Sequence, residues 1–301
     1  MSAHGAPFDE AVTAPPCAGP DSNPGSPSYV LPPDACDCHS HIFGPLLRFP
    51  YASTRSYTPP EAPLAAYLQM LDMLGLARAV LVQPSVYGDD NGCLLDGLAE
   101  SPRRLRGVVV IDPRKLGDRT IAEWSAKGVR GVRMNTWTPG GLPLDEIESI
   151  AARLAEIGWH LDLITDTCER LAETEHQLRA LPCEVVIEQM GRIKGDQPIT
   201  TPGFRALLRL LDHGRCWVKL SHAYHISTAG PPYGDTISPA RALVAVAPER
   251  LLWGSDWPHP MLHGPMPNDG SLVDLLAAWV PDETQRRAVL VDNPARLYGF
   301  S

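Results

Sequence analysis

Short apolar runs alternate with amphipathic segments along most of the chain. The apolar runs have the length and composition of buried strands, as in Arg-Ala-Val-Leu-Val-Gln at 78–83. Between them, apolar residues recur at helical spacing, for example Leu64, Leu68 and Leu71. The pattern therefore predicts strands that alternate with helices.

The alternation extends over most of the sequence and predicts a closed sheet. We predict eight strands, at 36–41, 78–83, 106–112, 129–135, 160–165, 184–189, 216–221 and 251–256. We predict helices at 60–76, 144–157, 168–181, 202–212, 239–246, 272–279 and 283–297. This order implies a single (β/α)8 TIM-like barrel. An open, doubly wound sheet is the alternative, but its usual Gly-x-Gly-x-x-Gly turn does not follow the first strand.

The first 33 residues differ from the rest in composition. They contain eight prolines among Gly, Ser and Ala. A segment of this composition has too few large apolar side chains to form a core. We expect residues 1–33 to form a disordered or draped arm, and residues 34–301 to form the barrel. The functional alternative is that the arm packs on a neighbouring subunit.

Composition excludes several classes of protein. The net charge is −9, and no Lys/Arg-rich run is present, which argues against nucleic-acid and anionic-membrane surfaces. No apolar stretch reaches the roughly 18 residues of a membrane span, and the N-terminus lacks the apolar core of a signal peptide. The sequence indicates no oligomeric state.

The cysteines favour a reducing, cytoplasmic environment. Seven cysteines are an odd number without regular spacing, which is not typical of a disulfide-rich secreted protein. Cys36 and Cys38 resemble half of a zinc knuckle, but a second cysteine pair at suitable spacing is missing. In a strand they would also point away from His39 and His41, so we interpret them as wall-packing residues.

Two segments near the ends of the chain carry the strongest chemical signal. His39 and His41 project to the same face of the first strand, because side chains in a strand repeat every two residues. Asp256 lies in Trp-Gly-Ser-Asp-Trp-Pro-His-Pro, at the end of the last strand. In a barrel, both strand ends open at the same mouth. Paired imidazoles and a carboxylate there can bind a metal, or polarise a carbonyl while the carboxylate activates water, so we predict hydrolysis.

Other strand ends offer polar groups to the same mouth. Ser85 could bind a substrate oxygen, although a turn-capping role explains it equally well. We favour Arg133 as a ligand for a substrate carboxylate, because an arginine at the end of a buried strand suits bidentate recognition. The alternative is a structural ion pair, which suits Arg130 better.

The sixth and seventh strands also end in polar residues. Glu188 can pair with Arg192 or another base rather than bind substrate. For His222 and His225, we favour the role of ordinary loop residues, while His225 stays a candidate for substrate binding.

Five motifs together resemble a known family. They are Asp-Cys-His-Ser-His-Ile-Phe-Gly-Pro at 37–45, Gln-Pro-Ser-Val-Tyr-Gly-Asp-Asp-Asn at 83–91, Gly-Val-Arg-Gly-Val-Arg-Met-Asn at 128–135, Trp-Gly-Ser-Asp-Trp-Pro-His-Pro at 253–260 and Val-Asp-Asn-Pro-Ala-Arg-Leu-Tyr-Gly at 291–299. The segment from about residue 34 to 300 resembles the amidohydrolase superfamily, in the amidohydrolase-related branch that contains 2-pyrone-4,6-dicarboxylate lactonase and D-galactarolactone isomerase.

The resemblance implies a distorted (β/α)8 barrel and roles for individual residues. Asp256 would be the general base for the attacking water. His39 and His41 would bind the lactone carbonyl or a metal, although the pyrone lactonase branch is regarded as metal-independent. Ser85 and Arg133 would contact substrate, and Tyr87 in the second motif is a further candidate for substrate binding.

Three departures from the family pattern bear on the substrate. Gln189 replaces a histidine in Asp-His-Met-Gly-Arg, and an amide binds a carbonyl but is a poor zinc ligand. His225 replaces an arginine in Ala-Tyr-Arg, and no second basic residue follows Arg133 in its loop. Met261 stands where the pyrone lactonase has a polar residue. We therefore expect a substrate pocket that has diverged, with fewer fixed positive charges.

The leading hypothesis is a lactonase. His39, His41 and Gln189 would polarise the ring carbonyl while Asp256 activates water. The substrate would be a small lactone or cyclic ester with at least one carboxylate, from aromatic or sugar-acid catabolism. No cofactor is required in this hypothesis. The alternative cofactor is one divalent metal, zinc or manganese, on His39, His41 and Asp256.

Other functions stay open. They are a lactone isomerase, a metal-dependent hydrolase or decarboxylase of the same superfamily, and a non-catalytic binding barrel, which the Gln189 substitution makes plausible.

Overall fold

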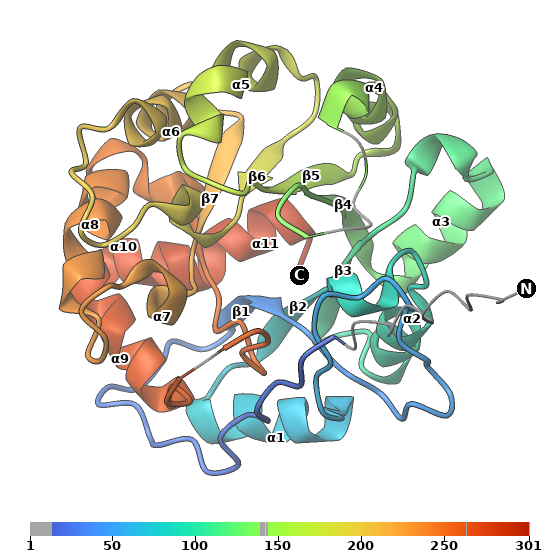
Figure 1. Cartoon of the computed structure of the whole chain (residues 1–301), viewed down its shortest axis with the longest axis horizontal. Helices are drawn as coiled ribbons and strands as arrows, with labels where there is room; N and C mark the ends of the chain where they lie inside the picture. Colours follow the sequence, from blue (N-terminus) through green and yellow to red (C-terminus); the bar gives the residue numbers. More distant parts are fainter. Residues whose placement is uncertain (1–13, 139–141, 143, 263, 301) are drawn as a thin grey trace, which may run out of the picture.

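Eight parallel strands form the centre of the protein, and helices surround them (Figure 1). The computed structural model describes residues 14–300 except 139–141, 143 and 263. The strands are β1 Cys36–Ser40, β2 Arg78–Val82, β3 Leu105–Val109, β4 Val129–Asn135, β5 His160–Ile164, β6 Val185–Ile187, β7 Cys216–Leu220 and β8 Leu251–Trp253. Each strand pairs with the next one in sequence, and a bridge between Ser40 and Trp257 joins the last connection to the first strand. The predicted (β/α)8 barrel is confirmed.

Eleven α-helices lie in the described part of the chain. They are α1 Leu64–Leu74, α2 Gly92–Glu100, α3 Asp118–Lys127, α4 Ile147–Ile157, α5 Arg170–Ala180, α6 Pro202–Asp212, α7 Ala223–Ile226, α8 Ile237–Val246, α9 Asp269–Trp279, α10 Glu283–Arg287 and α11 Asn293–Tyr298. None of these described helices is both long and apolar enough to cross a bilayer.

Local sequence explains why α6 begins where predicted. Thr201 caps it by accepting the Phe204 N–H at 3.4 Å, and Pro202 occupies the first turn, where no N–H is needed. Its apolar face, with Leu207 and Leu210, is buried against the barrel.

The helix predicted at 283–297 is divided in the structure, because a π-helical turn at Ala288–Asp292 separates α10 from α11.

One end of the barrel is closed by apolar side chains, which we call the floor. Tyr298 and Phe300, from the end of the chain, pack against residues of the strands. The floor consists of Cys36, Cys38, Val80, Val82, Val108, Val186, Trp217, Leu252, Tyr298 and Phe300. Cys36 and Cys38 thus pack among apolar side chains, but in the barrel interior, toward which His39 also points, and not in the wall as predicted. All seven cysteines are free thiols.

The described part of the N-terminal arm, residues 14–33, lies along the outside of the barrel. The Cys17 N–H donates to the Thr58 carbonyl at 2.9 Å, ahead of α1. Further along, the Gly25 N–H donates to Asn268 at 2.8 Å, and the Ser28 N–H to Asp274 at 2.6 Å. The arm therefore links the segment before α1 with α9. Residues 1–13 fall outside the described residues.

Candidate active site

An irregularity in β1 brings its histidines into the barrel. The register with β2 shifts between Asp37 and Ser40, so β1 has one more residue than β2 over this stretch. Such a bulge redirects the side chains that follow it. Cys38 packs in the floor, yet His39 next to it also reaches the interior, where it meets Lys219. The strict alternation assumed from the sequence therefore fails at this point.

The end of β8 lies directly against β1. The Asp256 N–H donates to the His39 carbonyl at 2.8 Å, and the His41 N–H donates to the Trp257 carbonyl at 2.7 Å. Gly254 permits this approach, because a Cβ atom there would lie 2.5 Å from the Cβ of His39. The predicted residues from the two ends of the chain therefore share one site.

Asp37 anchors this junction from behind. Its carboxylate accepts the Ser255 N–H at 3.0 Å, the His39 N–H at 3.1 Å and the Tyr67 hydroxyl at 2.9 Å. Burial raises the pKa of Asp37 to about 6, and the hydrogen bonds from Ser255, His39 and Tyr67 act in the opposite direction. The network fixes the backbone on both sides of the site.

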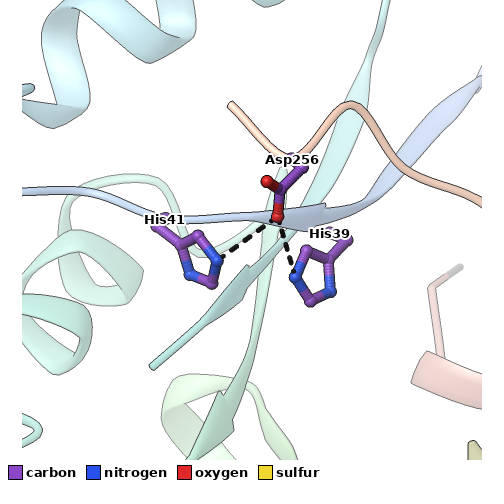
Figure 2. Close-up of side chains that lie close together, drawn as sticks. All are labelled: His39, His41 and Asp256. Atoms are coloured by element: carbon purple, nitrogen blue, oxygen red, sulfur yellow. Dashed lines mark ion pairs between the residues drawn. The ribbon is translucent and has the colours of Figure 1, made fainter. Parts of the chain in front are cut away.

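Asp256 lies between the two imidazoles (Figure 2). Its Oδ1 is 3.2 Å from Nε2 of His39 and 3.5 Å from Nε2 of His41, and all three side chains are buried. Asp256 has a φ of 66°, a left-handed conformation that costs energy for a residue with a Cβ atom. The surrounding bonds hold it there, which places the carboxylate against β1.

The second oxygen of Asp256 faces the connection after β7. Tyr224 donates its hydroxyl to Oδ2, and Nδ1 of His222 lies 3.4 Å from the same oxygen. Burial would raise the pKa of Asp256, but interactions with His222, His39 and His41 outweigh it and hold the pKa well below its usual range. Burial lowers the pKa of His222 well below its usual value. The Asp256 carboxylate is therefore ionised and surrounded by three imidazoles and the Tyr224 hydroxyl.

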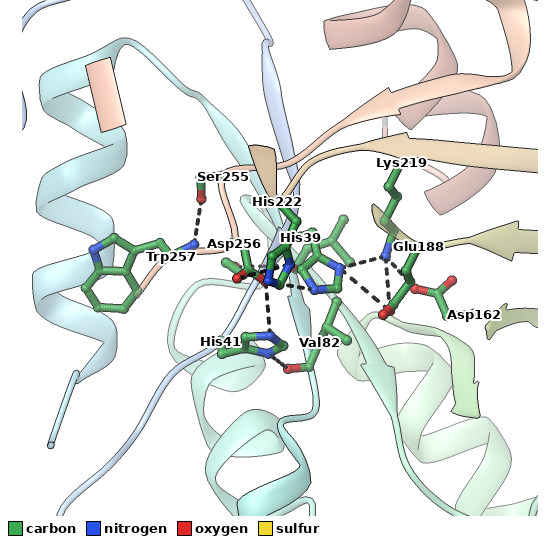
Figure 3. A network of polar contacts seen from close by, with 12 residues as sticks. His39, His41, Val82, Asp162, Glu188, Lys219, His222, Ser255, Asp256 and Trp257 are labelled. Atoms are coloured by element: carbon green, nitrogen blue, oxygen red, sulfur yellow. Dashed lines mark hydrogen bonds and ion pairs between the residues drawn. The ribbon is translucent and has the colours of Figure 1, made fainter. Parts of the chain in front are cut away.

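A group of buried charges lies beside His39 (Figure 3). Nζ of Lys219 donates to Asp162 and lies 3.3 Å from Nδ1 of His39 and 3.9 Å from Oε1 of Glu188. The Lys219, Asp162 and Glu188 side chains are fully buried. Since a buried charge is costly unless it is paired, the members of this cluster stabilise one another.

Arg133 belongs to the same cluster. It pairs with Glu188 through Nη2 at 2.7 Å and Nε at 3.1 Å, and Nη1 donates to the Gln83 carbonyl at 3.2 Å. The base that pairs with Glu188 is therefore Arg133. Arg130, for which an ion pair was expected, donates to the carbonyls of Ser125, Val129 and Tyr298.

Two further predicted residues lie after β2, in the 3₁₀ turn Ser85–Tyr87. The Ser85 side chain forms a hydrogen bond with Tyr57. The charges of Arg133 and Asp256 also act on the pKa of the Tyr57 hydroxyl, Arg133 lowering it and Asp256 raising it. Tyr87 accepts the Gly44 N–H at 3.0 Å on its hydroxyl. Ser85 thus lies close to the charged groups of the site, while the Tyr87 hydroxyl binds the backbone of the loop after β1.

The remaining predicted residues follow β6 and β7. Gln189 is buried directly after Glu188, in a left-handed conformation with a φ of 54°. The His225 ring stacks on His222 with 4.5 Å between centroids, and its backbone carbonyl accepts Nζ of Lys194 at 2.6 Å. Burial lowers the pKa of His225 to about 4. His222 and His225 therefore both pack at the site, although the sequence favoured ordinary loop residues.

Four polar residues of the site were not predicted: Tyr57, Asp162, Lys219 and Tyr224. For two of them a signal exists, because Asp162 and Lys219 interrupt otherwise apolar strands, in His-Leu-Asp-Leu-Ile and Cys-Trp-Val-Lys-Leu. A charge in a buried strand requires a partner, but the sequence does not say that the two are partners. Tyr57 lies in an irregular segment and Tyr224 in the four-residue helix α7, which is too short for a periodic pattern to mark it.

The three central residues have the spacing of a metal site, but their surroundings fit it only in part. One ligand atom from each of His39, His41 and Asp256 can be chosen so that all lie within 4.8 Å of one another. Nδ1 of His41 faces the Val82 carbonyl at 2.7 Å, which leaves Nε2 as a potential ligand. Nδ1 of His39 instead faces the Lys219 ammonium, whereas a ligating histidine normally has a hydrogen-bond acceptor there.

Comparison with known proteins identifies relatives along almost the whole chain. The sequence profile of the amidohydrolase family matches residues 36–300. A 4-sulfomuconolactone hydrolase from Rhizobium radiobacter is 39% identical, over 97% of this chain and 99% of the relative. A 2-pyrone-4,6-dicarboxylate hydrolase from Comamonas testosteroni is 37% identical, over 92% and 94%. A crystal structure of an Agrobacterium tumefaciens protein without ligand superimposes with a TM-score of 0.83 at 29% identity, over 91% and 99% of the two chains.

Proposed function

The chain belongs to the amidohydrolase family, and from this premise we propose that it hydrolyses a small anionic lactone with water activated by Asp256. One observation carries the proposal: the ionised Asp256 carboxylate lies 3.2 Å and 3.5 Å from the Nε2 atoms of His39 and His41 at the mouth of the barrel. The relatives described above are named as hydrolases of 4-sulfomuconolactone and 2-pyrone-4,6-dicarboxylate, and both names denote anionic cyclic esters. The geometry of the site and the reactions named for the relatives therefore both support lactone hydrolysis.

The reaction proceeds in two steps. Asp256 takes a proton from water as the water oxygen bonds to the carbonyl carbon, and the carbonyl electron pair moves to its oxygen. The imidazoles beside Asp256, those of His39 and His41, are the groups that stabilise that oxyanion. The intermediate then collapses, the ester C–O bond breaks, and the Asp256 proton passes to the leaving ring oxygen. The product is the open-chain hydroxy acid or its tautomer, and Asp256 is again ionised.

The substrate carries at least one anionic group in this proposal. Arg133 uses three of its five N–H groups for bonds to other described residues, and the other two are proposed to bind a substrate carboxylate. Ser85, Tyr87, Gln189 and His225 are proposed as further substrate contacts. The arginine that the family pattern has at His225 is missing here, which favours fewer anionic groups than a dicarboxylate.

No metal takes part in the proposed steps. The ammonium of Lys219 behind His39 is the argument, since it does not support that ring as a ligand. The seven free thiols agree with a reducing compartment, and we propose the cytoplasm as the site of this catabolic reaction.

Product analysis in ¹⁸O-labelled water tests the proposal. The protein is incubated with carboxylated lactones, pyrones and aldonolactones. Hydrolysis predicts one ¹⁸O atom in the new carboxylate for each substrate opened. Conversion without label would assign an isomerase, in which a substrate hydroxyl replaces water. Tight binding without conversion would assign a binding barrel.

A further inference from the structure

The two histidines of β1 differ in what their Nδ1 atoms meet. Nδ1 of His41 lies 2.7 Å from the carbonyl oxygen of Val82. Nδ1 of His39 lies 3.3 Å from the ammonium nitrogen of Lys219. A carbonyl only accepts hydrogen bonds and an ammonium only donates them. Nδ1 of His41 therefore faces an acceptor, whereas Nδ1 of His39 faces a donor (Figure 3).

Opposite partners place the ring protons on different nitrogens. A neutral His41 carries its proton on Nδ1, which donates to Val82, and Nε2 keeps a lone pair. A neutral His39 accepts from Lys219 on Nδ1 and carries its proton on Nε2. The competing neighbour of His39 is Oε1 of Glu188, which at 3.7 Å is too far for a hydrogen bond.

Lys219 lies close to two carboxylates as well as to His39. It donates to Asp162, and Oε1 of Glu188 lies 3.9 Å away. All three side chains are fully buried, so losing the ammonium charge would leave two carboxylates close together in the barrel interior. The direction of the bond to His39 follows from this arrangement.

We propose that Lys219 is a positioning residue that keeps the His39 proton on Nε2, so that His39 donates to the substrate carbonyl while His41 accepts from the attacking water. This inference rests on the proposed function for its chemical meaning. The tautomers themselves depend only on the arrangement of Val82, Lys219 and the two rings.

The geometry around Asp256 suits this division. Among the described residues, neither Nε2 of His39 nor Oδ1 of Asp256 has an aligned hydrogen-bond partner, so both can bind substrate or water. A water between Oδ1 and Nε2 of His41 donates one hydrogen to each, which turns its lone pairs outward. One proton goes to Asp256 as the oxygen attacks, and the proton of His39 stays on Nε2, where it stabilises the oxyanion.

Lys219 also decides whether the site can become a metal site. Without the ammonium, the polar neighbour of Nδ1 is the Glu188 carboxylate, which accepts a proton but cannot donate one. The His39 proton then moves to Nδ1 and frees the Nε2 lone pair. The resulting arrangement, a carboxylate behind a histidine beside His41 and Asp256, is the one that supports ligating histidines in metal sites.

The test compares three variants with the wild-type protein by ¹⁵N NMR of labelled histidines, with His39 assigned through the signal lost in His39→Gln. The variants are Lys219→Met, the double variant Lys219→Met/Asp162→Asn and Asp162→Asn alone. The double variant removes one charge of each sign, which protects against unfolding caused by an unpaired carboxylate. Asp162→Asn breaks the same ion pair but keeps Lys219 on His39.

We expect the His39 proton on Nε2 in the wild type and in Asp162→Asn, and on Nδ1 in both variants that lack Lys219. Zinc should bind those two variants tighter by about tenfold or more, the size of effect that outer-shell partners of metal ligands have. Structural damage alone would weaken zinc binding. A wild-type His39 protonated on Nδ1, or a tautomer unchanged without Lys219, would overturn the proposal.

Turnover separates this inference from the proposed function. With a lactone that the wild type hydrolyses, loss of Lys219 should lower kcat by roughly 10²-fold, as for an oxyanion donor, and change KM little. If no lactone is hydrolysed, the proposed function fails, but the NMR and zinc results still decide the role of Lys219. If lactones are hydrolysed and the tautomers do not differ, only the present inference fails.

Discussion

The two ends of the barrel interior differ in the side chains that line them. The floor is apolar, and Tyr298 and Phe300 seal it. The mouth holds buried carboxylates, imidazoles and an ammonium, joined by hydrogen bonds and ion pairs. Active sites of such barrels lie at the C-terminal ends of the strands, while the opposite end contributes stability. The difference indicates that changes at the two ends should affect different measurements.

The backbone shows the same contrast. Gln189, His222 and Asp256, which follow β6, β7 and β8, have φ values of 54°, 66° and 66°. Each such residue costs on the order of 1–3 kcal/mol and persists only where its surroundings hold it. The mouth is therefore a strained region that the rest of the barrel supports.

The largest expected effect is on chemistry at the mouth. Asp256→Asn removes the base, so kcat should fall by roughly 10²–10⁴-fold, while the urea midpoint changes little. Steady-state kinetics and urea unfolding check both parts, and Asp196→Asn, an exposed position on the loop after β6, is the matched control. Activity above a tenth of wild type would remove Asp256 from the mechanism.

The floor should respond in the opposite way. Tyr298→Ala leaves a cavity under a fully buried ring, and we expect the free energy of unfolding to fall by about 3–5 kcal/mol. The kcat of the folded fraction should stay near the wild-type value. Tyr298→Phe is the control, because the tyrosine hydroxyl has no hydrogen-bond partner among the described residues. A kcat that falls with stability in Tyr298→Ala would show that the two ends are coupled.

A smaller effect is expected where a residue only orients the base. Tyr224→Phe removes the hydroxyl that donates to Oδ2 of Asp256. A hydrogen bond to a charged group contributes about 1.5–3 kcal/mol, so kcat should fall by roughly tenfold or somewhat more. Kinetics at saturating substrate measure the change. A kcat equal to wild type would mean that His222, His39 and His41 hold the carboxylate without Tyr224.

The smallest effect is expected on the arm, outside both ends. Ser28→Ala removes the hydroxyl bond to Asp274 at 2.8 Å on the exposed surface. The free energy of unfolding should change by less than about 1 kcal/mol, and kcat should not change. Urea unfolding and kinetics check this, and a marked loss of activity would give the arm a role at the site.

Most of the fold could be predicted from periodicity, whereas the site could be predicted only in part. The apolar runs located all eight strands, because a buried parallel strand is marked by its own composition. The pairing of Arg133 with Glu188, and of Lys219 with Asp162, joins different strands, and no local pattern states which charges meet. The bulge that turns His39 inward depends on the register with β2, which the sequence of β1 alone does not reveal.

In the proposed mechanism, the site opens lactones with water activated by Asp256 and without a metal. The most direct measurement follows proton release from carboxylated lactones and pyrones by metal-stripped protein, and repeats it with zinc or manganese added. We predict full turnover without metal and no gain on its addition. Turnover that appears only after metal is added would contradict the metal-free mechanism and make His39, His41 and Asp256 metal ligands.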